Sequence, residues 1–431
     1  MGKYIRILIT GIVVSMFYFP FEFTFLPGIN TKMAMAGLGL AFLLFALVRE
    51  RSLSVPRPLF ILLCLAGLVS LVSLFSITYN RTPDTSYVSY IVSASVWLSA
   101  AYVACLTIRL THGRIDAALI TYYLIGVCVF QCIIAIVIDS VPAVQHIVDR
   151  VIAGGEFFHK IHRLYGIGAG LDIAGNRFSC VLVAIGFFLA KKNDTLTITQ
   201  LFLLFLSFAI IVVLGNMISR TTLIGSGLGL AVIVLFGNDL FKQKLGGSLK
   251  LFGIIGVVLL VGIPLVFFLY RTLPSFYQWM RFGFEGFFSL AETGRWEVSS
   301  NDVLVNMVVW PDNLKTWIIG DGHFVSERYD PYYIGPVLNA GFYKGTDIGY
   351  CRFLFYFGVV GLLTFSIYLA YAAYLCGKQF KEYALMFMIV LLAGFIMWSK
   401  TATDIFLFFA FYICASYMME DEDDDNALPV S

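Results

Sequence analysis

The sequence has little charge. Only 13% of its 431 residues are Asp, Glu, Lys or Arg, against about 25% in soluble domains, and 59% are hydrophobic. The formal net charge is +2, and no basic tract lies outside the short segments that flank apolar runs, so nothing indicates a nucleic-acid partner. The composition therefore predicts an integral membrane protein and excludes an ordinary soluble domain.

The cysteines and histidines are not spaced for covalent or metal chemistry. All eight cysteines fall in or at the edge of apolar runs, which argues against a disulfide framework and a zinc site. Four of the five histidines lie in two predicted outer loops. His159 and His162 are three residues apart but lack a nearby third ligand. We therefore expect no metal and no cofactor.

Long apolar runs account for most of the chain. A membrane helix needs about 20 mostly apolar residues. Twelve runs meet this requirement, at 5–26, 30–48, 58–77, 87–108, 117–138, 171–190, 196–214, 220–237, 250–270, 348–375, 382–398 and 402–419. The first run does not end in a small-residue cleavage site, so we take it as a retained span. We predict an all-α polytopic membrane protein with about twelve transmembrane helices.

Basic residues beside the runs predict the orientation. With the N-terminus inside, the inner segments hold fourteen Lys and Arg, and the short outer segments hold only Lys32, Arg81, Arg220 and Lys400. Both termini are then cytoplasmic, and the long loops at about 139–172 and 271–347 face outward.

The predicted layout has four parts. They are a bundle of nine spans over 1–270, an outer cap loop over 271–347, three spans over 348–419, and an acidic tail over 420–431 that is expected to be disordered and cytoplasmic.

The loop 271–347 carries four tryptophans, which is too aromatic for a disordered segment and indicates a folded, helical cap. Residues 293–310 have the pattern of an amphipathic helix that Pro311 stops. Its polar side holds Arg295, Ser299, Asp302 and Asn306. This side is either part of a binding site or a solvated face.

Several arginines lie in or beside the outer segments. They are Arg163, Arg177, Arg220, Arg295, Arg328 and Arg352. A guanidinium stays charged and can bind phosphate oxygens bidentately, so the group predicts a site for an anionic ligand. Each arginine could instead snorkel or pair with a carboxylate. Arg163, Arg220 and Arg295 are the strongest candidates, because short outer segments gain nothing from positive charge.

Two further residues are candidates for proton transfer. In the turn IIGDGHF, two glycines flank Asp321 and are expected to leave His323 exposed, as a general base or as a surface histidine without a role. Asp347 begins the tenth predicted span, near Arg352. It could orient an acceptor hydroxyl, or Thr346 or Asp347 could cap the helix.

These features, in this order, resemble the O-antigen polymerase and ligase superfamily, the Wzy-type and WaaL-type proteins of bacterial envelopes. ISRTT resembles the family's Ser-x-Arg-Thr segment, and RLYGIGAG resembles its arginine-containing segment in the earlier outer loop. The stretch from GRWEV through GDGHF to TDIGYCRFLFYFGVVGLL resembles its signature. The ligases have a histidine near the position of Asp347, which favours the polymerase branch. The Arg-x10-Gly motifs of some polymerases are absent, since Ala174 and Asn306 follow Arg163 and Arg295 at that spacing.

The resemblance implies a metal-independent glycosyltransferase with a GT-C-like fold, in the bacterial inner membrane with its long loops in the periplasm. It would transfer a growing glycan from undecaprenyl diphosphate to a hydroxyl of the next lipid-linked unit. Arg163, Arg220 and Arg295 would hold the diphosphate leaving group, and Asp347 or His323 would position or deprotonate the hydroxyl. Arg177, Arg328 and Arg352 would complete the substrate site.

The implied partners are the lipid-linked oligosaccharide, the bilayer, a chain-length regulator and a flippase. Three alternatives stay open. They are a ligase that transfers finished glycan to lipid A core or protein, a transporter or flippase of a lipid-linked glycan, and a structural component of an export complex.

Overall fold

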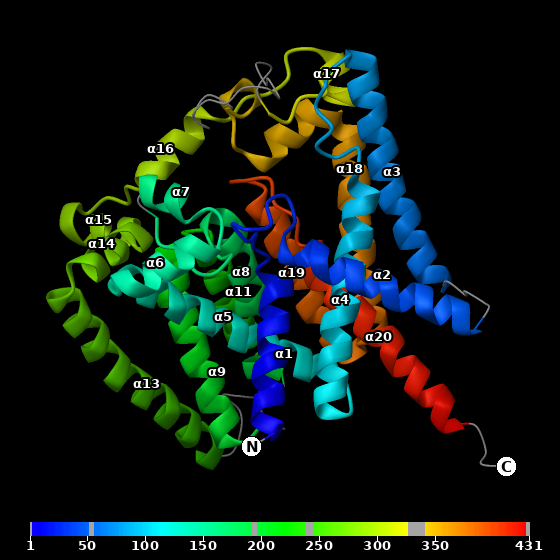
Figure 1. Cartoon of the computed structure of the whole chain (residues 1–431). Coiled ribbons are helices and arrows are strands. Elements are labelled where there is room, and N and C mark those ends of the chain that lie inside the picture. Colours follow the sequence, from blue (N-terminus) through cyan, green and yellow to red (C-terminus); the bar gives the residue numbers. More distant parts are fainter. Residues whose placement is uncertain are drawn as a thin grey trace. The chain divides into compact units, whose positions relative to one another are not determined.

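The computed structural model describes residues 2–50, 56–161, 163–191, 196–237, 245–325 and 341–427. Throughout these ranges the regular structure is helical, and the extended segments form isolated bridges and no strand (Figure 1). The predicted all-α class is therefore confirmed.

A helix lies in each of the twelve apolar runs. These helices are α1 (Gly2–Tyr18), α2 (Thr31–Glu50), α3 (Arg57–Asn80), α4 (Tyr90–His112), α5 (Ala117–Ser140), α8 (Leu171–Lys191), α9 (Ile198–Ile210), α11 (Thr222–Phe236), α13 (Leu245–Thr272), α18 (Gly349–Gln379), α19 (Ala384–Met397) and α20 (Phe406–Ala427). α9 continues through the π-helical turn η2 (Ile211–Gly215) into α10 (Asn216–Ile218).

Shorter helices lie in the connecting segments. These are α6 (Pro142–Val151), α7 (Gly155–Lys160), α14 (Pro274–Gly283), α15 (Glu285–Thr293), α16 (Ser299–Asn306), α17 (Leu314–Ile319), η4 (Tyr343–Gly345) and η5 (Lys381–Tyr383).

Six helical segments among the described residues are long and apolar enough to cross a membrane: α3, α4, α5, α8, the continuous run Ile198–Ile218 and α18. The pair Gly256–Thr272 and Pro274–Gly283, bent by 117°, is a seventh candidate, and Thr31–Phe45, Thr222–Phe236 and Phe406–Met419 are shorter apolar helices. The chain is thus a multi-pass helical membrane protein. The number of twelve spans stays a prediction.

The chain folds into two compact units. The first comprises Met1–Met35, Val103–Glu297 and Ala415–Ser431, and the second comprises Ala36–Tyr102 and Val298–Cys414. The segment predicted as one cap is therefore divided, with 271–297 in the first unit and 298–347 in the second. α20 reaches Ala427, so the helix enters the acidic stretch 420–431, and residues 428–431 lie outside the described part.

In the first unit, α8 packs closely against α11 through small residues. A Cβ placed on Gly225 would lie 2.2 Å from the Cα of Ser179, and one on Gly229 would lie 2.8 Å from the carbonyl oxygen of Leu182. Later residues of α8 meet later residues of α11, so the two helices run parallel. Gly225 and Gly229 are four residues apart, and small residues at this spacing let membrane helices approach closely.

In the second unit, α18 is broken at Phe357 and Gly358, where Gly358 adopts φ +66°. The break leaves carbonyl groups without helical partners, and the turn after α17 supplies donors to them. The amide of Asp321 donates to the carbonyl oxygen of Phe355 (2.6 Å), and that of Gly322 donates to Tyr356 (3.1 Å). A Cβ on Gly320 would lie 2.6 Å from the Tyr356 carbonyl, so this approach needs glycine.

We predict that Gly225→Leu destabilises the protein because the added side chain forces α8 and α11 apart. Overpacking of this kind costs about 1–3 kcal/mol or more. The matched control is Gly227→Leu, since Gly227 lies on the same helix and has no atom within 4 Å of its built Cβ. Thermal unfolding in detergent should show a transition several degrees lower for the first variant alone. Equal transitions would contradict the close packing.

Candidate functional site

One face of α14 carries the residues around which the site in the first unit is built. Ser275, Gln278, Trp279 and Phe282 are spaced i, i+3, i+4 and i+7, so they share one side of the helix. Pro274 opens α14 at the sharp bend from α13. At the other end, a Cβ on Gly283 would lie 2.9 Å from the Asn216 carbonyl oxygen. This contact holds α14 beside the segment that leads to Arg220.

Arg163 and Arg220 converge on the ring of Phe282. Their guanidinium carbons lie 4.1 and 4.3 Å from its centroid, so they are at most 8.4 Å apart. Arg220 is paired with Glu285, whereas Arg163 forms no ion pair within the described ranges. Burial, and then the charge of Arg220, lower the pKa of Arg163, and Asp172 partly opposes this. Arginine still stays protonated at neutral pH, so the arrangement suits an anion.

The turn that carries Arg220 is fixed against the start of α8. The hydroxyl of Ser219 donates to Asp172 Oδ1 (3.1 Å) and lies 2.6 Å from that of Thr221. A Cβ on Gly175 would lie 1.9 Å from Thr221 Oγ1, so the turn and α8 are in direct contact. In the ISRTT segment, Ser219 and Thr221 therefore hold the backbone and leave Arg220 directed at Phe282 and Glu285.

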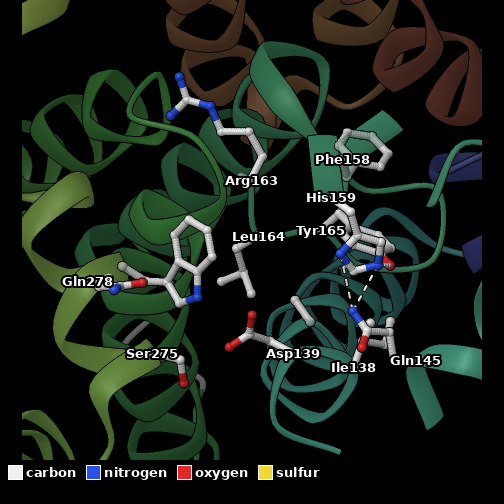
Figure 2. A pocket seen from close by; sticks show the side chains of 12 residues that line it. Ile138, Asp139, Gln145, Phe158, His159, Arg163, Leu164, Tyr165, Ser275 and Gln278 are labelled. Carbon is white, nitrogen blue, oxygen red and sulfur yellow. Dashed lines mark hydrogen bonds between the residues drawn. The ribbon is translucent and has the colours of Figure 1, made fainter. Parts of the chain in front are cut away.

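A cavity of about 220 Å³ lies beside the arginine pair (Figure 2). Its walls come from α14, from the end of α5 at Asp139, from Gln145 of α6, and from the segments 158–159 and 163–165, with Arg163 shared between the cavity and the pair. Trp279 lines it, and the Trp279 Nε1 donor is buried with no hydrogen-bond partner among the residues that the structure describes. An unsatisfied buried donor costs about 1–3 kcal/mol, so a bound molecule that accepts from it gains that contribution.

One wall of the cavity is a hydrogen-bonded network around Asp149. His159 Nε2 lies 2.9 Å from Asp149 Oδ2, and the Tyr165 hydroxyl donates to Asp149 Oδ1 (2.7 Å). The side-chain amide of Gln145 lies 2.8 Å from His159 Nε2 and 3.2 Å from Nδ1 (Figure 2). Burial, together with the hydrogen bond to Asp149, raises the pKa of Tyr165, so its hydroxyl stays a donor at neutral pH.

Two other predicted arginines of the first unit lie elsewhere. Arg177 is buried within α8, with its guanidinium carbon 5.5 Å from the centroid of Phe19. Arg295 is exposed, and its carbonyl oxygen accepts from Ser289 Oγ (2.9 Å). The predicted helix over 293–310 is wrong at both ends. Gly294 adopts φ +71° and ends α15, helix resumes only at Ser299, and it ends at Asn306, before Pro311.

His323, Asp347 and Arg352 lie in the second unit. The expected exposure of His323 is wrong. Its side chain is half-buried, its ring stacks on Tyr343 with centroids 5.0 Å apart, and its Nδ1 is buried. The flanking glycines do not open the turn to solvent, because Gly320 and Gly322 fit against α18 and α3.

Asp321, between these glycines, is held by three donors. Lys315 Nζ and Thr316 Oγ1 each lie 2.6 Å from Oδ1, and the Tyr343 hydroxyl lies 3.1 Å from Oδ2. Burial raises the pKa of Asp321, but the hydrogen bonds from Lys315, Thr316 and Tyr343 outweigh it, and the net pKa is lowered. The carboxylate therefore stabilises the turn in its ionised form.

Arg352 is enclosed by aromatic rings. Its guanidinium carbon lies 3.7 Å from the centroid of Phe324 and 4.2 Å from that of Phe342, and Nη1 lies 3.5 Å from Asp347 Oδ1. These contacts tie α18 to the segments before it. The predicted ligand Arg328 lies outside the described residues, as does His162.

Several residues of the first-unit site were missed from the sequence, among them Asp139, Asp149, Tyr165, Phe282, Glu285 and, as a cavity residue, Trp279. A shared helix face could have been predicted from the spacing of Ser275, Gln278, Trp279 and Phe282. The Asp149 network had no such signal, because it depends on how α6 and α7 fold back on each other.

Comparison of the chain with protein-family models, curated proteins and solved structures finds no match. The family resemblance of the sequence therefore stays a prediction based on short motifs. The case for a function comes from the geometry of the site.

We predict that Asp321→Asn lowers thermal stability at pH 7 by about 1.5–3 kcal/mol, since it weakens hydrogen bonds to a charged group. The folded-state pKa is below that of the unfolded chain, so this contribution is present above the unfolded value of about 3.9 and is lost as the pH falls below it. Unfolding of the wild type and variant at pH 7 and pH 3 should therefore show a gap that narrows in acid. Asp312→Asn, an exposed neighbour, serves as control. A gap that stays constant with pH would show that the charge of Asp321 does not matter.

Proposed function

We propose that this chain is a glycosyltransferase that polymerises lipid-linked polysaccharide repeat units. It transfers the growing glycan from undecaprenyl diphosphate to a hydroxyl of the next lipid-linked unit, in a bacterial inner membrane, on a GT-C-like bundle of twelve spans with cytoplasmic termini. The observation that carries the proposal is the convergence of Arg163 and Arg220 on Phe282, beside a polar cavity, in a multi-pass membrane protein.

The position of the two arginines supports a diphosphate ligand. Arg163 precedes α8 and Arg220 precedes α11, and these helices run parallel in contact. Both guanidiniums therefore lie at the end where the two helix dipoles are positive, which favours anions. Lys191 lies at the opposite end of α8, where the basic residues predict the cytoplasmic side.

Glu285 does not prevent anion binding at Arg220. The side chains of Arg220 and Glu285 are 16% and 32% exposed, so the pair is neither a surface pair, worth about 0–1 kcal/mol, nor a fully buried one. A diphosphate offers several oxygens to both arginines at once, so it can displace the single carboxylate at Arg220. In the protein without ligand, the Glu285 carboxylate then occupies the place of a phosphate oxygen at Arg220.

An apolar groove in the same unit supports a lipid tail. Its volume is about 910 Å³, and α1 and α5 line it with side chains such as Ile12 and Phe130. Ile152, three residues after Asp149, and Ile167, two residues after Tyr165, also line it. An apolar groove and a cationic site in one unit fit a molecule with a polyprenyl chain and a diphosphate head.

In the proposed reaction, the acceptor hydroxyl oxygen attacks the anomeric carbon of the donor glycan. The bond from that carbon to the diphosphate oxygen breaks, and the diphosphate leaves with the electron pair, stabilised by Arg163 and Arg220. The hydroxyl proton passes to a base. Asp347 and His323 are the candidates from the sequence, and His159, hydrogen-bonded to Asp149, is a third.

We predict that Arg163→Ala or Arg220→Ala, expressed in a strain that lacks the gene, reduces polymerisation by about a hundredfold or more, because each removes a donor to the leaving group. The ladder of lipid-linked or surface glycan should collapse to single repeats. Arg281→Ala is the matched control, since Arg281 lies on α14 beside Phe282 but pairs with Glu292.

Membrane levels of each variant are measured by immunoblot. An unchanged ladder in both variants at normal protein levels would refute the role of the pair. A ladder that persists in the deletion strain but leaves the cell surface would identify a ligase. A deletion strain without any glycan change would refute the polymerase proposal.

A further inference from the structure

The cavity between α14 and residues 139–165 has no assigned ligand. It adjoins the arginine pair directly, because Arg163 lines the cavity and also contacts Phe282. Its volume of about 220 Å³ corresponds to about seven water molecules and is below the range of about 300–1,000 Å³ for drug-sized ligands. The space therefore suits one small ring rather than an oligosaccharide.

Hydrogen-bonding groups of both kinds belong to residues of the cavity wall. Trp279 Nε1 is a donor without a partner in the described part of the chain, so it requires an acceptor. Figure 2 shows the Asp139 carboxylate directed into the space near Ser275 and Leu164, where it accepts only. A hydroxyl group can satisfy either wall, and a ring with several hydroxyls can satisfy both.

The cavity also offers aromatic surface. Trp279 lines one side, and on another side Phe158 and Tyr165 stack with centroids 4.9 Å apart. A pyranose ring has apolar C–H faces as well as hydroxyl edges, so it matches a site with aromatic faces and polar atoms.

The Asp149 network makes this wall rigid before any ligand binds. Asp149 fixes both His159 and Tyr165, and a Cβ on Gly155 would lie 1.8 Å from Asp149 Oδ1, so the backbone of α7 closes over the carboxylate. A preorganised wall avoids the entropy cost of ordering side chains on binding.

We propose that this cavity binds one neutral sugar ring of the lipid-linked glycan, at the position next to the diphosphate. The assignment rests on the proposed function and adds the residues that recognise the sugar. Trp279 donates to a ring oxygen or hydroxyl, Asp139 accepts from a hydroxyl, and the Phe158–Tyr165 wall packs on the ring.

The test measures binding of two probes to the full-length protein in nanodiscs. One probe is undecaprenyl diphosphate without sugar, and the other is the single lipid-linked repeat unit extracted from the deletion strain. Trp279→Phe keeps one aromatic ring but removes the Nε1 donor and part of the ring surface. We expect it to weaken binding of the repeat unit about fivefold or more, with binding of the bare lipid unchanged.

Three further variants make the result specific. Asp139→Asn should also affect the repeat unit alone, whereas Arg163→Ala should weaken both probes. Trp296→Phe, at an exposed tryptophan of the same unit, should change neither. If Trp279→Phe and Asp139→Asn bind both probes like the wild type, or weaken both equally, the cavity is not the sugar site and the polymerase proposal stands. If the wild type binds neither probe, both proposals fail.

Discussion

The contact between α8 and α11 is the constraint on which the first-unit site depends. Glycine at 225 and 229 removes the side chains that would separate the two backbones. Because the helices run parallel, their N-terminal ends coincide, and the segments that precede them are brought together. Arg163 and Arg220, far apart in sequence, become neighbours only for this reason. A pair of helices packed at a wider spacing or in opposite directions would not form an electropositive site at one end.

Two like charges at most 8.4 Å apart repel each other by at least about 0.5 kcal/mol in a water-like medium and about 2 kcal/mol at an effective dielectric of 20. Phe282 offsets part of this, since each cation–ring contact contributes about 0.5–1 kcal/mol at an exposed site. Glu285 offsets a further part at Arg220. The pair is therefore tolerable in the free protein, but a bound dianion relieves the remaining repulsion. The direction of α14, set by Pro274 and Gly283, places the ring where it can do this.

The sequence predicted the helical class and a helix in every apolar run, because apolar length is a local property that needs no knowledge of contacts. It also selected Arg163 and Arg220 as candidates, and the structure brings these two together at Phe282. It did not predict that Arg295 precedes its helix, since this depends on the left-handed conformation of Gly294. Nor did it predict the Asp149 network, because that network depends on how α6 and α7 fold back on each other and carries no periodic signal.

The turn at Gly320 and Gly322 shows why a glycine motif identifies a close approach without identifying the partner. From the sequence, the two glycines were expected to admit a ligand and expose His323. In the structure they admit the backbone of α18, whose break leaves the carbonyl groups of Phe355 and Tyr356 to be satisfied by the turn. A glycine without a Cβ allows either a ligand or a backbone to approach. The carbonyl groups left by the break in α18 determine that a backbone approaches here. The sequence of the turn does not show these acceptors, because they arise where α18 breaks at Phe357 and Gly358. The role of the two glycines therefore follows from the break in α18 and not from the turn alone.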